Sequence, residues 1–481
     1  MTRSDEVDRP DLPAPGAGAD RLSTQLAASA DPGLAGGAVA PTPAADSASN
    51  RTALSDGLAL SISGAVGSLA GFISWLVAAR LMPQEAVGYA SAFVSAFLLV
   101  AGTAQLNLDA GLMLWMPKAG RKAPLLFWRS HALIIPACLA VGLVYVLAVV
   151  PSLAVTGAGA NGPPALGVLL FLVAAAGWGL WGVHDYTLVI VEKPWWAAWR
   201  NVGFAIVRIG LLLALGMSLG PQGIVLSWVL PIAVWTVAGA LIGGVLTRRF
   251  GRRTDTGWLP TRREAVSFLG PTTVAHWGTV LLMNQVTVIV IERFGPVPGA
   301  AFFIAWQAVM VIDIAAARFM LSLSTQVARD PDRARAHIAA SRKRLFMIFV
   351  PLVLVGVLLA DIGLRIFGAG YAEAANVLRV LLIGMIPRLV ITHELGVRQA
   401  LNNGMGFARL QLVSTLVVIV VALFAPIGAA DATGLYTVES MMPLAVGYTI
   451  AQAVCALYLL VAPRLRRRPA AADAAIGDLP R

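Results

Sequence analysis

The chain is built from long apolar runs that alternate with short polar or basic segments. A helix of about 20 apolar residues crosses the ~30 Å hydrocarbon core of a bilayer. Backbone polar groups have no water to bond there, so helices are the expected form of such runs. We expect about twelve spans, near residues 57–81, 86–115, 131–151, 165–191, 195–217, 222–246, 266–291, 298–326, 345–363, 374–397, 407–426 and 440–462. The sequence therefore predicts an all-α integral membrane protein.

The composition agrees with a membrane protein. Hydrophobic residues make up 58% of the chain and charged residues 13%, whereas about 25% of a soluble chain is charged. The formal net charge of +11 does not indicate a nucleic-acid partner, since the basic residues lie in short loops between apolar runs. The two cysteines, Cys138 and Cys455, fall inside expected spans. They predict neither a disulfide framework nor a metal cluster.

A short pattern recurs halfway along the chain. Arg80 and Pro83 follow the first expected span, and Arg293 and Pro296 follow the seventh; 293 − 80 and 296 − 83 are both 213. A repeat of nearly half the chain indicates two pseudo-symmetric six-helix bundles around a central cavity. The expected parts are a disordered cytoplasmic tail (1–54), an N-terminal bundle (55–250), a cytoplasmic linker (251–264), a C-terminal bundle (265–463), and a basic, then disordered cytoplasmic tail (464–481).

Basic residues lie almost entirely on one side of the expected spans. Most Lys and Arg follow even-numbered spans, and the connections after odd-numbered spans hold only Arg80, Arg293 and Arg365. Because short basic loops stay in the cytoplasm, we expect a multi-pass protein of the cytoplasmic (inner) membrane with both termini inside. Residues 334–345 could also form a basic helix lying on anionic membrane lipid, or serve only as an orientation signal.

No sequence motif indicates an enzyme. The chain lacks a Gly-rich phosphate loop followed by Lys-Ser or Lys-Thr, an HExxH motif and a paired Cys-x-x-Cys. The first outer loop carries Glu85 but no paired acidic motif that would hold a metal for glycosyl transfer. We therefore predict no catalytic residue, no metal and no cofactor, and transport is favoured over catalysis.

Arginines inside or at the mouths of the spans are the candidate substrate contacts. The four candidates are Arg80, Arg208, Arg318 and Arg388. Charged groups are costly in hydrocarbon and usually face a partner or a cavity, and the planar guanidinium matches a phosphate with two parallel hydrogen bonds. Structural alternatives stay open for each arginine. Arg208 could neutralise Asp185, Arg318 could pair with Asp313, and Arg80 could extend to the interface.

A second group of polar residues could couple transport to an ion. It comprises Asp109, His184, Asp185, His276 and Asp313. Histidine titrates near neutral pH, and burial can raise the pKa of a carboxylate into the same range. The alternative is that these side chains make polar contacts between helices.

One stretch resembles a known family. Residues 57–120 read GLALSISGAVGSLAGFISWLVAARLMPQEAVGYASAFVSAFLLVAGTAQLNLDAGLMLWMPKAG, with a small-residue first span, the turn at Arg80 to Pro83 and a stop at Pro117 before a basic loop. This resembles polysaccharide biosynthesis proteins of the O-antigen flippase type, in the multidrug/oligosaccharidyl-lipid/polysaccharide exporter superfamily. The resemblance implies a MATE-like fold with a V-shaped cavity between two bundles. It also implies movement of undecaprenyl-linked glycans to the outer leaflet by alternating access. Asp109 stands where that family tends to carry uncharged residues.

Three functions remain open on the sequence. The first is a flippase for lipid-linked oligosaccharide or polysaccharide precursors, which could work beside a polysaccharide polymerase or glycosyltransferase complex. The second is a cation-coupled multidrug exporter that uses carboxylates in its cavity. The third is an integral membrane glycan-modifying enzyme with His184 or His276 as a catalytic residue. The residues alone do not specify the glycan, the driving ion or the oligomeric state.

Overall fold

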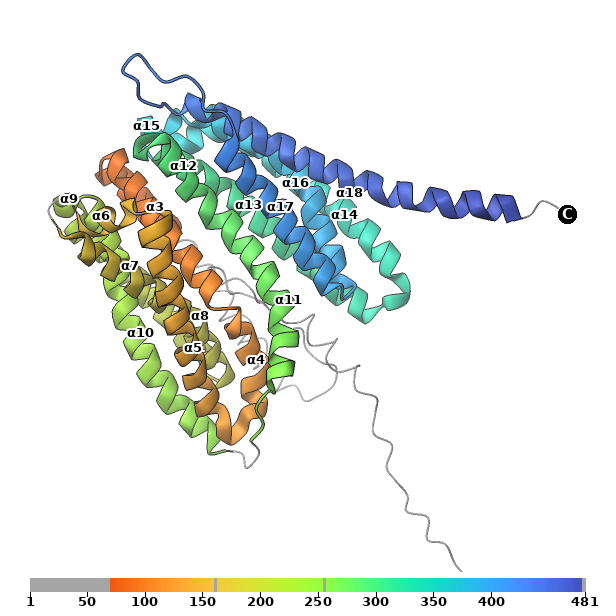
Figure 1. The fold of residues 1–481 in the computed structure, drawn as a ribbon, viewed down its shortest axis with the longest axis horizontal. Coiled ribbons are helices and arrows are strands. Elements are labelled where there is room, and N and C mark those ends of the chain that lie inside the picture. Colours follow the sequence, from red (N-terminus) through yellow and green to blue (C-terminus); the bar gives the residue numbers. More distant parts are fainter. Residues whose placement is uncertain (1–69, 160–161, 254–256, 478–481) are drawn as a thin grey trace, which may run out of the picture.

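The computed structural model describes residues 70–159, 162–253 and 257–477 (Figure 1), and side chains as far as residue 461. The first half of this part, residues 70–251, holds the Ala70–Leu81 helix, α3 (Gln84–Ala104), α4 (Leu108–Ala119), α5 (Ala123–Val144), α6 (Ser152–Ala158), α7 (Pro164–Gly179), α8 (Trp181–Ile190), α9 (Pro194–Leu219) and α10 (Pro221–Gly251). The second half, from residue 262 onward, holds α11 (Arg262–Val280), a π-helical turn (Leu281–Gln285), α12 (Val286–Phe294), α13 (Pro296–Arg329), α14 (Ala334–Arg365), α15 (Ala369–Ala372), α16 (Ala375–Ala400), α17 (Gly404–Phe424) and α18 (Met442–Gly477).

Within the described ranges, eleven helical segments are long and apolar enough to cross a membrane. The first expected span, 57–81, is described only from Ala70, and it is helical from there to Leu81. The predicted all-α membrane fold is thus confirmed. The tail expected at 1–54 lies outside the described residues, and the expected domain boundaries stay predictions.

Proline and glycine set many of the helix ends. Proline occupies the first turn of α7, α9, α10 and α13, where its missing N–H has no helical partner to lose. Gly220 and Gly295 take positive φ values of 55° and 89° between consecutive helices, which glycine adopts without steric cost. Thr261 and Glu264 form a capping box that starts α11.

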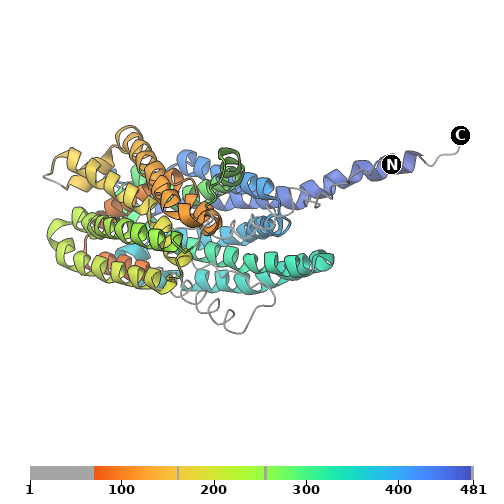
Figure 2. The same cartoon turned by 90° about the horizontal axis from the view of Figure 1, so that it is seen from below.

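The same helix pairings recur in the two halves. In the first half α3 packs on α7, α5 on α7 and α7 on α10; in the second half α13 packs on α16, α14 on α16 and α16 on α18. Figures 1 and 2 agree in placing the first-half helices, orange to lime, beside the second-half helices, green to blue. This equivalence is the two-bundle arrangement that the repeat of Arg80 and Arg293 predicts.

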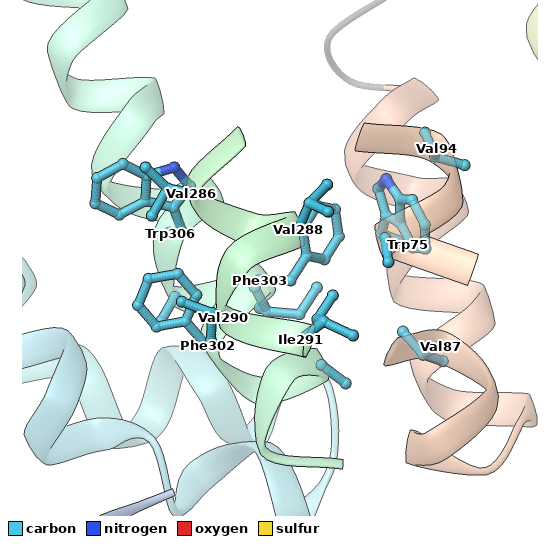
Figure 3. Packing of buried hydrophobic residues seen from close by; sticks show 14 of the residues in the cluster. Trp75, Val87, Val94, Val286, Val288, Val290, Ile291, Phe302, Phe303 and Trp306 are labelled. Atoms are coloured by element: carbon cyan, nitrogen blue, oxygen red, sulfur yellow. The ribbon is translucent and has the colours of Figure 1, made fainter. Parts of the chain in front are cut away.

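One continuous apolar seam joins the halves. The α3 helix packs against α11, α12 and α13, and Trp75 meets Phe303 edge to face with ring centroids 4.7 Å apart. Figure 3 shows Val288 and Ile291 pointing across this seam toward Trp75 and Val87. A Cβ on Gly88 would lie 2.0 Å from the carbonyl oxygen of Pro296, so the two backbones touch there.

One of the spans is broken where it faces α11. We expected one helix over 86–115, but it is broken between α3 and α4, where Leu106 and Asn107 take left-handed φ values of 53° and 54°. Side chains of α11 bond the carbonyls that the break exposes: Trp277 Nε1 donates to Thr103 O at 2.9 Å, and Thr273 Oγ1 donates to Leu106 O at 2.8 Å. Tertiary hydrogen bonds therefore stabilise a break that the apolar pattern does not reveal.

Basic segments gather at one end of the molecule. This basic end comprises the connections after α4, α8, α10, α13 and α16; the other end is called the opposite end. Arg253 pairs with Glu192 at 3.2 Å, and Lys118 lies 5.9 Å from the ring centroid of Trp258. Residues 334–345, for which a helix on the lipid surface was one of two alternatives, form the first part of α14.

The contact at Gly88 gives a first prediction. Gly88→Val should lower the melting temperature of the purified protein by several degrees, because the added carbons meet a backbone carbonyl and overpacking costs about 1–3 kcal/mol. Gly210→Val is the matched control, since a Cβ at Gly210 would have no atom of the described residues within 4 Å. Equal melting temperatures for the two variants would contradict the seam contact.

Candidate functional site

A cavity of about 710 Å³ lies between the two halves. The first half contributes an aromatic and polar wall from the Ala70–Leu81 helix and from α3, α7, α8, α9 and α10. Its aromatic residues are Phe72, Trp75, Trp178, Trp181, Tyr186, Phe204 and Trp228. The second half contributes an apolar wall; among its described lining residues, only Asn284 and Gln307 carry polar side chains. The cavity thus has one polar side and one apolar side.

Arg208 is the basic residue of the cavity wall. Its side chain is nearly buried, with 4% exposed. Nη2 donates to Ser74 Oγ at 2.6 Å and to the Ala70 carbonyl at 2.9 Å, and Nε donates to Ser74 Oγ at 3.2 Å. The guanidinium carbon lies 4.1 Å from the ring centroid of Trp228. These partners are neutral, so within the described residues no carboxylate balances this charge.

Asp185 lies on the same wall but pairs with a different arginine. Arg200 Nη2 lies 2.9 Å from Asp185 Oδ1, and Asn201 Nδ2 donates to Oδ2 at 3.2 Å. Arg200 also stacks over the Trp181 ring at 4.0 Å. The alternative that Asp185 neutralises Arg208 is therefore wrong. Asp185 thus makes a polar contact between helices, which is the alternative to ion coupling given in the sequence analysis.

Arg388 and Asp313 lie in a separate cavity of about 160 Å³ inside the second half. Arg388 makes two hydrogen bonds to Asp313: Nε donates to Oδ1 at 3.0 Å, and Nη2 donates to Oδ2 at 3.1 Å. Thr392 Oγ1 also donates to Asp313 Oδ1, at 3.2 Å. Asp313 thus pairs with Arg388 across two helices rather than with Arg318 on its own helix. Arg318 and His276 line this second cavity too.

Arg80 and Arg293, the repeated pair, each bond the carboxyl end of a helix. Arg293 bonds the carbonyls of Ala422 and Ala425 at the end of α17, within its own half. Arg80 instead reaches across to the other half, where Nε donates to Ile366 O at 2.6 Å and Nη2 to Arg365 O at 3.1 Å, at the end of α14. Both arginines satisfy carbonyls that have no helical partner.

Two further candidate residues lie outside the lining of both cavities. Asp109 is buried at the start of α4, where Oδ1 accepts from the Ala110 N–H at 2.9 Å. His184 Nε2 lies 3.0 Å from His131 Nε2, and His131 Nδ1 lies 2.9 Å from the Phe127 carbonyl oxygen. The sequence interpretation missed His131, although it is a lone histidine at the start of an apolar run.

The structure also assigns a role to residues that the sequence interpretation set aside. Arg200 was counted among the basic residues of a loop, but it is the seventh residue of α9 and pairs there with Asp185. Among the described residues, no group of three or more His, Cys, Asp or Glu side chains could hold a metal ion. Of the nine candidate residues, the large cavity brings together Arg208 and Asp185, and the small one brings together His276, Asp313, Arg318 and Arg388.

Comparison with solved structures places this fold among known transporter structures. The chain superimposes on the lipid II flippase MurJ in an inward closed conformation with a TM-score of 0.58 and 16% identity, over 82% of this chain and 87% of that one. A point mutant of a MATE protein matches with a TM-score of 0.48 and 16% identity (85% and 94% covered), and an inward-facing MATE family transporter of the MOP superfamily with 0.46 and 15% (93% and 94% covered).

No protein-family model matches the chain. No curated protein matches it either. The similarity to MurJ shows a shared fold. The more specific resemblance to O-antigen flippases stays a prediction.

The buried ion pair gives a second prediction. Asp313→Leu should destabilise the protein by about 3–5 kcal/mol, because it leaves the Arg388 guanidinium buried without its counter-charge. Asp313→Leu combined with Arg388→Met should recover most of that loss. The control is Asp361→Leu, which breaks an exposed pair with Arg365 and should cost about 1 kcal/mol or less. The free energy of unfolding in detergent is measured for the three variants. A double variant as unstable as Asp313→Leu alone would refute the pairing of Asp313 with Arg388.

The different partners of Arg80 and Arg293 give a third prediction. Arg80→Ala should widen the opposite end, because Arg80 ties one half to the other, whereas Arg293→Ala removes bonds within one half only. Spin labels at the exposed residues Leu219 and Ile427 report the separation by pulsed electron paramagnetic resonance. The distance distribution should shift to longer values in Arg80→Ala alone. Identical distributions in both variants would rule out this role for Arg80.

Proposed function

We propose that this protein is a flippase that moves lipid-linked oligosaccharide or polysaccharide precursors across the cytoplasmic membrane by alternating access. The observation that carries the proposal is Arg208, a buried guanidinium on the wall of a cavity between two transmembrane bundles, bonded only to neutral groups among the described residues. An unbalanced charge at bilayer depth is costly unless an anion arrives to balance it.

The remaining hydrogen-bonding capacity of Arg208 suits a phosphate. Its Nε and Nη2 are engaged by Ser74 and Ala70, while Nη1 makes no hydrogen bond within the described residues. A guanidinium held in this way is pre-oriented, so little side-chain entropy is lost when a phosphate oxygen binds. The indole of Trp178 on the same wall is partly exposed and offers an apolar surface to a sugar ring.

The arrangement of the ends supports a transport cycle. Arg80 and the Phe72–Phe367 edge-to-face contact, with centroids 5.4 Å apart, tie the halves together at the opposite end. The basic end faces the cytoplasm by the rule that positive loops stay inside, which puts both termini there and the opposite end outside. Release of the opposite end would open the cavity to the outer leaflet.

The other two functions have less support. A cation-coupled drug exporter needs a carboxylate available to the cargo, but Asp185 is paired with Arg200 and Asp313 with Arg388. For a glycan-modifying enzyme, neither His184 nor His276 lines the large cavity. The shared fold with MurJ also favours transport over catalysis. A polymerase or glycosyltransferase partner and binding of anionic lipid at residues 334–345 remain part of the proposal.

Substitution of Arg208 tests the proposed function directly. Arg208→Gln should slow translocation of a lipid-linked oligosaccharide in proteoliposomes by roughly 10- to 100-fold, since a hydrogen bond to a charged group contributes about 1.5–3 kcal/mol. Arg208→Lys keeps the positive charge but lacks the planar guanidinium, so its translocation rate should lie between those of the wild type and Arg208→Gln. Arg293→Gln is the control, because it removes a guanidinium outside the cavity. Translocation at the wild-type rate in Arg208→Gln would overturn the proposal.

A further inference from the structure

The apolar wall of the large cavity carries two carboxamide side chains, Asn284 and Gln307. Residues 298–310 of α13 are buried except for Gln307 and Ala308, and both of these line the cavity. The Gln307 side chain therefore faces the cavity, and within the described residues it makes no hydrogen bond. Polar side chains at this depth usually bond a neighbouring helix, so an unbonded one facing a cavity indicates a binding residue.

Asn284 reaches the cavity from a turn that the first half holds in place. It belongs to the π-helical turn Leu281–Gln285, a form that is frequent at functional sites. Tyr145 Oη, in the first half, donates to Gln285 Oε1 at 2.7 Å. Asn284 Nδ2 donates to a carbonyl of its own helix at 3.1 Å, which leaves Oδ1 as an acceptor without a partner among the described residues.

The two carboxamides lie at the same level of the molecule as Arg208. The connections after α9 and α12 belong to the opposite end, and α13 starts there. Arg208 lies 11 residues before the last residue of α9, Asn284 ten before that of α12, and Gln307 11 after the first residue of α13. At 1.5 Å per residue, all three are about 15 Å from that end, near the middle of the ~30 Å hydrocarbon core. The part of a cargo next to a phosphate at Arg208 is therefore at the depth of the carboxamides.

The surroundings of the carboxamides narrow the group that they could bind. Asn284 Oδ1 can accept a hydrogen bond and Gln307 Nε2 can donate one, so the pair matches a group that holds both a donor and an acceptor. The lining residues beside them, Met283, Ile304 and Ala308, are apolar. An acetamido group has an N–H, a carbonyl oxygen and a methyl group, and it therefore fits two amides set in an apolar wall.

We propose that Asn284 and Gln307 bind the acetamido group of the sugar next to the phosphate, so that the protein selects lipid-linked glycans that begin with an N-acetylated amino sugar. This inference rests on the proposed function and adds the class of the first sugar. Asn284 Oδ1 accepts from the acetamido N–H, and Gln307 Nε2 donates to the acetamido oxygen. A 2-hydroxyl in its place offers one atom to the two carboxamides and no methyl group to the wall, so it binds more weakly.

Two probes that differ only at the second carbon of the sugar test this inference. They are farnesyl diphosphate linked to N-acetylglucosamine and farnesyl diphosphate linked to glucose, titrated into the protein in nanodiscs and followed by quenching of tryptophan fluorescence. The wild type should bind the first probe roughly 10-fold more tightly, because two neutral hydrogen bonds contribute about that ratio.

Variants of similar side-chain volume remove one carboxamide at a time. Asn284→Leu and Gln307→Met should each lower the preference to about 3-fold, and the double variant should lower it to less than 2-fold, because the N-acetylglucosamine probe loses its hydrogen bonds. Gln326→Leu is the matched control, since it removes a glutamine of α13 that lines neither described cavity. It should keep the wild-type preference.

The ratio of the two affinities separates this inference from the proposed function. Arg208→Gln should weaken both probes alike and keep the ratio between them. Equal binding of the two probes by the wild type, or an unchanged ratio in Asn284→Leu and Gln307→Met, would overturn the inference and leave the phosphate site standing. Unchanged affinity for both probes in Arg208→Gln would refute the phosphate site, on which the inference rests. Melting temperatures confirm that each variant is folded before it is compared.

Discussion

A buried positive charge without a carboxylate partner among the described residues is the feature on which the proposed role of the large cavity depends. Arg208 and Arg388 are about equally buried, yet their surroundings differ. Arg388 is balanced by a two-pronged bond to Asp313, so its charge is already satisfied and contributes to the structure of the second half. Arg208 has a serine hydroxyl, a backbone carbonyl and aromatic rings, which orient the guanidinium but leave its charge to be met by something from outside. Surroundings, rather than depth in the membrane, thus distinguish the arginine proposed to bind substrate from the structural one.

The twofold repeat organises the molecule, and its departures from symmetry are informative. Equivalent helices pair in the same way in both halves, but the repeated arginines differ: Arg293 stays within its half and Arg80 crosses to the other. The two cavity walls differ as well, one aromatic and cationic, the other apolar. An amphiphile with an anionic head is likewise divided into a charged part and an apolar part. The difference between the two walls therefore matches the chemistry of the proposed cargo.

Much of the fold could be predicted from the sequence, and much of the site could not. Apolar run lengths and the Arg80/Arg293 repeat depend on local composition and spacing, so they predicted the spans and the two halves. Pairing depends on which helix faces which. The sequence therefore allowed an ion pair of Asp185 with Arg208, whereas in the structure Arg200, eight residues earlier on α9, makes that ion pair. The break at Leu106 and Asn107 was missed for the same reason, since donors 167 and 174 residues away stabilise it. The partner of His184, His131, also comes from another span.

The backbone contact between Gly88 and Pro296 has a mechanical consequence. It fixes one point on each half, so the halves cannot slide along each other without separating there. Gly88 lies near the beginning of α3, and the rest of that helix extends about 24 Å from it at 1.5 Å per residue. The contact then acts as a fulcrum with unequal arms. A tilt of about 10° about this contact would swing the far end of α3 by roughly 4 Å, whereas opening of the opposite end requires Gly88 and Pro296 to separate.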